Sequence, residues 1–229
     1  MRDSRTGGNA LGEAIKSAPR PHDPDAAQRL REAVGAAFDP LTQRERALIE
    51  GVAGCSPYLS RLMARDFALV IEILRAPPRQ MLTRACATAA KAGAADAQAE
   101  QIKILRRAKD EAALAIALAD IAGVWTVMEA AGAVSTFADA AVNAALAAAA
   151  KFAKLEQGVR GIAVLAMGKH GGEELNYSSD IDLVLVFDHR AMGFATSSEA
   201  QAGAVKAARE MVHLLQTQTP DGYVFRTDL

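Results

Sequence analysis

The apolar residues recur at helical spacing over residues 23–157, and near residue 158 the pattern changes to runs of strand length. In the first region, Asp23-Pro24 and Ser56-Pro57 each place a capping side chain before a proline, which is typical of a helix start. Pro77-Pro78 ends one apolar helix, because proline lacks the N–H that a continuing helix needs. The pattern therefore predicts a bundle of consecutive helices in this region.

Two longer helices are expected within this bundle. One covers Ala97–Ala122, and its apolar stripe comprises Leu114, Leu118 and Ile121. Its basic residues lie mostly off this stripe, and we interpret them as a solvated face: Lys103, Arg106, Arg107 and Lys109. The other helix is rich in alanine, the best helix former, and is expected to begin at Ser135, after Gly132, and to reach about Lys154.

From residue 158, two apolar runs of strand length, Ile162–Met167 and Ile181–Phe187, flank a polar turn. This glycine turn contains Gly168, Lys169, Gly171 and Gly172. A helix is predicted next, because Thr196-Ser-Ser-Glu199 fits a capping box. Its buried stripe is expected at Val205, Ala208, Val212 and Leu215. Pro220-Asp221-Gly222 then predicts a turn, and Tyr223–Leu229 a further strand.

These elements predict an α+β protein, with a helical region followed by a mixed sheet and its flanking helices. Residues 1–22 are rich in Gly, Arg, Ser and Pro, so we expect a disordered leader there. Residues 23–157 are expected to form the helical region and residues 158–229 the sheet domain. Because the sequence stops inside its last predicted strand, we expect that domain to be incomplete and the chain to be a fragment of a longer protein.

Composition narrows the class of protein. A net charge of −1, a pI near 6.4 and 5% aromatic residues argue against a nucleic-acid binder. The alanine-rich segment Ala130–Ala153 contains Asp139 and Asn143, so we interpret it as a helix of a soluble protein and not as a membrane span. Cys55 and Cys86 have no metal-ligand spacing and are expected to be buried, in a reducing compartment. The N-terminus lacks an apolar signal segment, so a cytoplasmic protein is expected.

The acidic residues at the start of the second strand are the main candidates for chemistry. Asp180 and Asp182 are two residues apart and therefore project from the same face of that strand. Asp228, in the last predicted strand, can join them. Such carboxylates suit Mg²⁺, which prefers few carboxylates together with phosphate oxygens and water. Two ions about 3.5–4 Å apart stabilise in-line displacement at phosphorus, so the pattern predicts metal-assisted nucleotidyl or phosphoryl transfer.

The glycine turn is the candidate phosphate site. Glycines such as Gly168, Gly171 and Gly172 let backbone N–H groups approach phosphate oxygens, because no Cβ intervenes. Lys169 can add a positive charge for the same phosphates. Ser179, directly before the acidic pair, is a further candidate for nucleotide binding.

Two other side chains near these elements leave their roles open. Arg226 lies two residues before Asp228 and so on the same strand face, where a phosphate contact and a surface salt bridge are both possible roles. His170 has no nucleophile beside it in the sequence. We interpret it as a residue of the turn or of the substrate rim, and not as a general base.

Each of these features also has a purely structural interpretation. Glycine turns are common, Asp180 could cap a turn with Ser178 and Ser179, and Asp228 could be an ordinary strand-end residue. The combination is far more specific than any part of it. A glycine turn followed closely by Ser-Asp-Ile-Asp-Leu in an apolar strand favours a functional site.

The segment MGKHGGEELNYSSDIDLVLVFD (residues 167–188) resembles the glutamine synthetase adenylyltransferase/adenylyl-removing family of the polymerase-β-like nucleotidyltransferase superfamily. Residues 54–66 and 105–125 are similar to that family's N-terminal helical region, and residues 225–229 to its third metal-carboxylate strand. The resemblance implies a truncated polymerase-β-like palm after the helical bundle. It also implies metal ligation by Asp180, Asp182 and Asp228, and phosphate binding by Lys169, Gly171 and Gly172. Gly172 stands where many adenylyl-removing units have alanine.

The resemblance further implies Mg²⁺-dependent removal of AMP from a tyrosine of glutamine synthetase. Inorganic phosphate attacks the α-phosphorus and ADP results, with regulation by a P-II-type nitrogen regulatory protein. Members of the family contain two nucleotidyltransferase units, and the ELNYSSDIDL motif near the start of this chain is similar to the removing unit. No nucleic-acid or membrane partner is implied.

Two alternatives stay open. One is the opposite reaction, transfer of AMP from ATP to a protein or small-molecule hydroxyl, which uses the same metal chemistry. The other is a catalytically inert regulatory or scaffolding fragment whose helical region binds partners.

Overall fold

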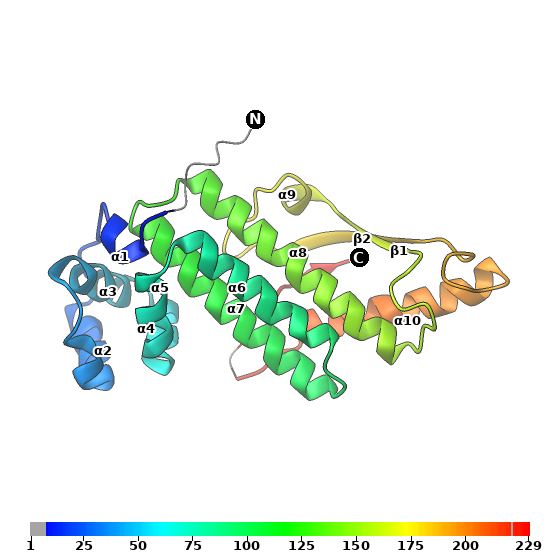
Figure 1. Ribbon diagram of the computed structural model, residues 1–229, viewed down its shortest axis with the longest axis horizontal. Helices are drawn as coiled ribbons and strands as arrows, with labels where there is room; N and C mark the ends of the chain where they lie inside the picture. Colours follow the sequence, from blue (N-terminus) through cyan, green and yellow to red (C-terminus); the bar gives the residue numbers. More distant parts are fainter. Residues whose placement is uncertain (1–7, 221) are drawn as a thin grey trace. The chain divides into compact units, whose positions relative to one another are not determined.

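The structure is a computed structural model that describes residues 8–220 and 222–229. The elements follow in the order α1 (Leu11–Ala14), α2 (Pro24–Val34), η1 (Gly35–Phe38), α3 (Gln43–Cys55), α4 (Pro57–Arg65), α5 (Phe67–Arg75), α6 (Pro78–Ala90), η2 (Lys91–Gly93), α7 (Gln98–Ile121), α8 (Val127–Phe152), β1 (Ile162–Ala166), α9 (Gly168–Gly171), β2 (Ile181–Phe187), α10 (Ser197–Gln216) and β3 (Thr227–Asp228) (Figure 1). This is an α+β fold, as the sequence predicts.

The chain forms two compact units, and their limits differ from the boundary near residue 157 that the sequence suggests. One unit extends to Thr83 and also includes Asp110–Ala130. The other comprises Arg84–Lys109 and Ala131–Leu229. Helices α6, α7 and α8 therefore each contribute residues to both units. The division into a helical region and a sheet domain stays a prediction.

Two helices of the first unit, α2 and α4, start where the sequence predicts. Asp23 caps α2 by accepting a hydrogen bond from the N–H of Ala26, with proline at the first helical position. Ser56 caps α4 in the same way, by accepting from the N–H of Leu59. The core of this unit is aliphatic and includes Leu48, Ile49, Val52, Met63, Val70, Ile73, Leu74, Leu114 and Leu118.

The expected disordered leader is ordered from Leu11 onward. Residues 1–7 lie outside the described residues, but Leu11 is fully buried and its N–H donates to the carbonyl of Ala76. The N–H groups of Lys16 and Ser17 both donate to the carbonyl of Ala122. This part of the expected leader therefore packs in the core, because apolar burial of Leu11 and three backbone hydrogen bonds offset its chain entropy.

A buried carboxylate makes the first unit sensitive to acid. Glu45 is buried in α3, and its carboxylate accepts hydrogen bonds from Arg75 and from the N–H of Thr42. Burial by itself raises the pKa of Glu45, but the hydrogen bonds from Arg75 and Thr42 outweigh it and the pKa is lowered below its ordinary value of 4.5. The stabilisation is therefore fully present above pH 4.5 and is lost as the pH falls through the lowered pKa.

We expect Glu45→Gln to lower the free energy of unfolding by about 1–2 kcal/mol at pH 7, because a buried charge pair costs about 3–5 kcal/mol to break and Arg75 is half exposed. Urea unfolding of both proteins from pH 7 to pH 3 measures this difference. The difference should shrink as the pH falls below 4.5. A difference that stays constant with pH would contradict this account.

The second unit contains a three-stranded mixed sheet in the described residues, with the order β1-β2-β3. Strands β1 and β2 are antiparallel, with Ile162 opposite Phe187 and Ala166 opposite Leu183. Strands β2 and β3 are parallel. The predicted strand Tyr223–Leu229 is shorter in the structure, where β3 comprises only Thr227 and Asp228. Asp221, within the predicted turn, lies outside the described residues, while Thr219 and Gly222 on either side of it pair as a short bridge.

Helix α8 begins at Val127, eight residues before the predicted start. Gly132 is expected to precede the helix, yet the helix runs through it, since a glycine costs only about 1 kcal/mol in a helix interior. A capping box sets the true start: Thr126 accepts from the N–H of Glu129, whose carboxylate accepts from the N–H of Thr126. Among the described helices, α8 is long and apolar enough to cross a membrane, but most of its apolar stretch is buried within the protein.

Helix α10 starts at the predicted capping box, where Thr196 and Glu199 exchange hydrogen bonds. Its buried stripe differs from the prediction. Val205 is 41% exposed, and Ala208 and Val212 are only partly buried. The buried residues are Ala200, Ala204, Ala207, Glu210, Met211, Leu214 and Leu215, so only Leu215 of the predicted stripe is fully buried. The three buried alanines allow close packing of the helix.

The two cysteines are less buried than the sequence suggests, and they differ. Cys55 is exposed, and its thiol donates to the carbonyl of Arg20. Cys86 is half-buried, and the pKa of its thiol is raised, mainly by burial and to a smaller extent by the negative charge of Asp139.

We expect Ellman's reagent at pH 8 to modify Cys55 at least about tenfold faster than Cys86, because the thiolate is the reactive form. The Cys86→Ser variant shows which thiol gives which rate, since it should lose only the slow phase of the reaction with the reagent. Equal rates for the two thiols would contradict the difference in burial and pKa.

Candidate nucleotide site

The sheet brings two of the three predicted carboxylates together. In the parallel pairing of β2 with β3, Asp182 lies directly opposite Asp228, and Ile181 lies opposite Thr227. Ile181 and Thr227 are buried, whereas both aspartates are exposed, as the alternation of a strand requires. Asp180 is also exposed and directly precedes β2. The register therefore places two carboxylates on one face of the sheet.

A three-carboxylate metal centre is not assembled in this structure. Within residues 8–220 and 222–229, no group of three His, Cys, Asp or Glu side chains is close enough to hold a metal ion. The facing pair does suit Mg²⁺, which takes one or two carboxylates and completes its shell with phosphate oxygens and water. Asp182 and Asp228 are thus the residues that fit a cation, and the role of Asp180 as a third ligand stays a prediction.

The glycine turn, which includes the single helical turn α9, lies close to Asp182, one of the two facing aspartates. Gly168 has φ +53°, in the left-handed region. A Cβ at Gly168 would lie only 2.8 Å from Oδ2 of Asp182. Glycine has no Cβ and so avoids this close contact. The N–H of Met167 also donates to the carbonyl of Asp182, at 2.8 Å. The backbone of the turn thus approaches the carboxylate that faces Asp228.

The other two glycines of the turn have different requirements. A Cβ at Gly171 would lie 2.5 Å from the backbone oxygen of Ala166, whereas one at Gly172 would meet nothing closer than 3.6 Å. Gly172 therefore has room for the alanine that the resemblance places there. The N–H groups of both glycines donate within the turn, to the carbonyls of Met167 and Gly168. Their role in phosphate binding stays a prediction, as does that of the exposed Lys169.

A second turn connects the glycine turn to the acidic pair, and Asn176 caps it. The side-chain oxygen of Asn176 accepts from the N–H of Ser178 at 2.9 Å, and the hydroxyl of Ser179 accepts from the N–H of Asn176 at 3.1 Å. Arg226 donates to the carbonyl of Ser178 at 3.1 Å. Asn176 thus takes the capping role considered for Asp180, and Arg226 holds this turn to the strand that carries Asp228.

Helices α7 and α8 support the last segment of the chain. Arg106 is buried and donates to the carbonyl of Tyr223, and the ammonium of Lys109 lies 4.0 Å from the ring centre of Phe225. Phe225 also packs on Phe137 of α8. The interpretation of these basic residues as a solvated face is therefore wrong for Arg106 and Lys109. They hold the segment that leads to β3.

His170 is not at the rim of the site. It is 4% exposed, and its Nε2 lies 2.9 Å from Oδ1 of Asp139 on α8. The sequence gives no signal for this pair, since the two residues are 31 positions apart.

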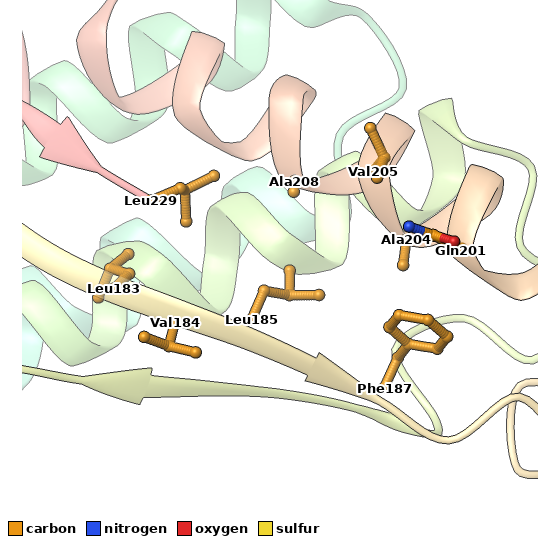
Figure 2. Close-up of a pocket in the computed structure, with 9 residues that line it drawn as sticks. All are labelled: Leu183, Val184, Leu185, Phe187, Gln201, Ala204, Val205, Ala208 and Leu229. Atoms are coloured by element: carbon orange, nitrogen blue, oxygen red, sulfur yellow. The ribbon is translucent and has the colours of Figure 1, made fainter.

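An apolar groove lies between β2 and α10 (Figure 2). It is lined by Leu183, Val184, Leu185, Phe187, Gln201, Ala204, Val205, Ala208 and Leu229. Among the described residues, no charged side chain lines the groove, so it does not suit phosphate groups, and Asp182 and Asp228 are not part of its lining. The partly exposed Val205, which departs from the predicted stripe, belongs to this groove.

The described residues thus form an α+β protein whose mixed sheet has a glycine turn at one end and facing aspartates on adjacent strands. Comparison with known proteins shows the family. A family model described as glutamate-ammonia ligase adenylyltransferase matches residues 46–229. The chain belongs to this family.

Curated relatives carry the name bifunctional glutamine synthetase adenylyltransferase/adenylyl-removing enzyme. The chain is 39% identical to that of Bradyrhizobium sp. (strain BTAi1) over 248 residues, covering 97% of this chain and 25% of the relative. It is 39% identical to that of Xanthobacter autotrophicus over 243 residues, covering 100% of this chain and 24% of the relative. The protein of Caulobacter vibrioides is 38% identical over 90% of this chain. The chain thus spans about a quarter of the length of these relatives.

Proposed function

We propose that this chain is the N-terminal part of a bifunctional glutamine synthetase adenylyltransferase/adenylyl-removing enzyme and carries its adenylyl-removing unit. The family membership and the names of the curated relatives support the choice of glutamine synthetase as the substrate. The motif of residues 167–188 supports the removing direction by resemblance. A P-II-type regulatory protein and a cytoplasmic location complete the proposal.

The reaction is phosphorolysis. An oxygen of inorganic phosphate attacks the α-phosphorus of the AMP–tyrosine ester and forms a new P–O bond, while the bond to the tyrosine oxygen breaks. ADP leaves, and the tyrosine oxygen takes up the proton that the attacking phosphate gives up. Mg²⁺, when bound, neutralises phosphate charge and aligns the attacking and leaving oxygens.

In this scheme the residues of the chain position the reactants. Asp182 and Asp228 hold the cation between adjacent strands, with Asp180 as a third ligand. The glycine turn keeps side chains away from the nucleotide phosphates, and the positive charge of Lys169 attracts them. The single observation that carries the proposal is the register that sets Asp182 opposite Asp228, with the backbone of Gly168 against the carboxylate of Asp182.

The test uses adenylylated glutamine synthetase, the 229-residue chain, inorganic phosphate and Mg²⁺. We expect ADP to form, and the mass of the glutamine synthetase subunit to fall by one AMP group. A parallel reaction contains unmodified glutamine synthetase, ATP and Mg²⁺.

A gain of AMP in the parallel reaction alone would show the opposite activity. If neither reaction proceeds and calorimetry detects no binding of Mg–ADP at millimolar concentration, the proposal fails and the inert regulatory fragment is the better description.

A further inference from the structure

We propose that His170 is a positioning residue of the nucleotide site, and that Asp139 on α8 is the group through which it acts. The hydrogen bond between them holds the glycine turn at the distance from the acidic pair that Mg–ADP binding requires. The consequence for nucleotide binding rests on the proposed function, whereas the effect on the turn itself does not.

The chemistry of the pair fixes which atom donates. The carboxylate of Asp139 can only accept, so the proton of the imidazole lies on Nε2 and is donated over 2.9 Å. The side chain of His170 is 2% exposed, while that of Asp139 is 66% exposed. The buried partner is thus the one that belongs to the turn, and its orientation depends on a group at the surface of another helix.

The other ring nitrogen shows that packing alone does not explain this histidine. Nδ1 of His170 is buried and has no hydrogen-bond partner within the described residues. A buried polar atom without a partner is unfavourable, by about 1–3 kcal/mol for a typical group. An apolar side chain of similar size would avoid this penalty, so the hydrogen bond to Asp139 is the feature that requires histidine here.

A second contact from α8 acts on the same segment. One helical turn before Asp139, the hydroxyl of Ser135 accepts from the N–H of Leu175 at 3.4 Å. Ser135 is buried and Leu175 is fully buried. Residues four apart lie on the same face of a helix, so one face of α8 contacts the chain both within the glycine turn and three residues after it.

The position of this segment matters because there is no room for a side chain between Gly168 and the carboxylate of Asp182. The hypothetical Cβ at Gly168 lies only 2.8 Å from the carboxylate, so a small movement of the turn changes the space beside the acidic pair. The helix α8 therefore determines the geometry of the phosphate side of the site, through a residue that does not touch the nucleotide.

The decisive variants are His170→Leu and Asp139→Ala in the 229-residue chain. His170→Leu removes the donor together with the unpartnered Nδ1, and Asp139 can be hydrated, so the free energy of unfolding should change little. Asp139→Ala leaves the buried Nε2–H of His170 without its acceptor, so its free energy of unfolding should fall by about 1–3 kcal/mol. Asn143→Ala, at an exposed position one turn further along α8, is the matched control.

Each variant is tested in two ways. Hydrogen exchange of the amides of residues 168–176 should be faster in His170→Leu and in Asp139→Ala, and unchanged in Asn143→Ala. The dissociation constant of Mg–ADP, measured by calorimetry, should rise about tenfold in both, which is the loss of one hydrogen bond. The double variant should be no weaker than either single one. His170→Gln can place its amide nitrogen near the position of Nε2 and should restore affinity.

The outcomes separate the two ideas. Unchanged exchange in His170→Leu and Asp139→Ala, or an additive double variant, would overturn the positioning role. In His170→Leu, a loss of affinity that is matched by an equal loss of folding stability would show a merely structural role and overturn it as well. If the unsubstituted chain neither forms ADP nor binds Mg–ADP, the proposed function fails, and the exchange rates alone then decide whether His170 and Asp139 hold the turn.

Discussion

Asp182→Asn is expected to lower the rate of ADP formation from adenylylated glutamine synthetase by at least about 10³-fold. The substitution keeps the size of the side chain but removes the negative charge that faces Asp228. A bound cation stabilises the charge of the transition state and so lowers the barrier to phosphoryl transfer by several kcal/mol. Each 1.36 kcal/mol of barrier changes the rate about tenfold. Asp228→Asn should have an effect of similar size, because the proposal assigns both carboxylates to the same ion.

The matched control is Asp188→Asn, directly after the other end of β2. Asp188 is exposed, and its carboxylate accepts from the N–H groups of Arg190 and Ala191, which the amide oxygen of asparagine can also do. Its turnover should stay within about twofold of the unsubstituted chain. Rates measured by coupled detection of ADP, at several Mg²⁺ concentrations, distinguish a weakened metal site from a slower chemical step. If Asp182→Asn turned over as fast as the unsubstituted chain, the assignment of Asp182 as a metal ligand would be wrong.

The sequence predicts much of the fold because its signals are local. The caps at Asp23 and Thr196 and the period of β2 each fix an element within one residue of its observed start. The start of α8 was predictable too, from the capping box at Thr126, but the glycine at Gly132 received more weight than it has in a packed helix.

The site is only partly predictable from the sequence. Alternation in a strand shows which way Asp182 and Asp228 face, but their register depends on strand pairing over 46 positions. The contact of Arg106 with Tyr223 spans 117 positions and so leaves no local pattern. The buried face of α10 was misjudged for a similar reason. Its alanines have no strong apolar signal, and only the neighbouring strand determines that they face inward.

A second large effect is expected in the glycine turn, where three glycines have different surroundings. Gly168→Ala places a side chain in the left-handed region, which costs about 1–2 kcal/mol, and its Cβ displaces the carboxylate of Asp182. We expect the chain to fold, with ADP formation lowered about 100-fold, since misplacing a catalytic group by about 1 Å costs about that factor. Gly171→Ala should lose folding stability instead, by about 1–3 kcal/mol, because its Cβ meets the backbone of β1.

Gly172→Ala is the internal control for this series. Its φ is −84°, and the nearest atom to the new Cβ would be 3.6 Å away, an ordinary van der Waals contact. Both stability, measured by thermal unfolding, and turnover should therefore stay close to those of the unsubstituted chain. If Gly172→Ala proved as harmful as Gly168→Ala, the turn would need glycine for flexibility throughout its length. The close approach of Gly168 to Asp182 would then not be the reason for the effect of Gly168→Ala.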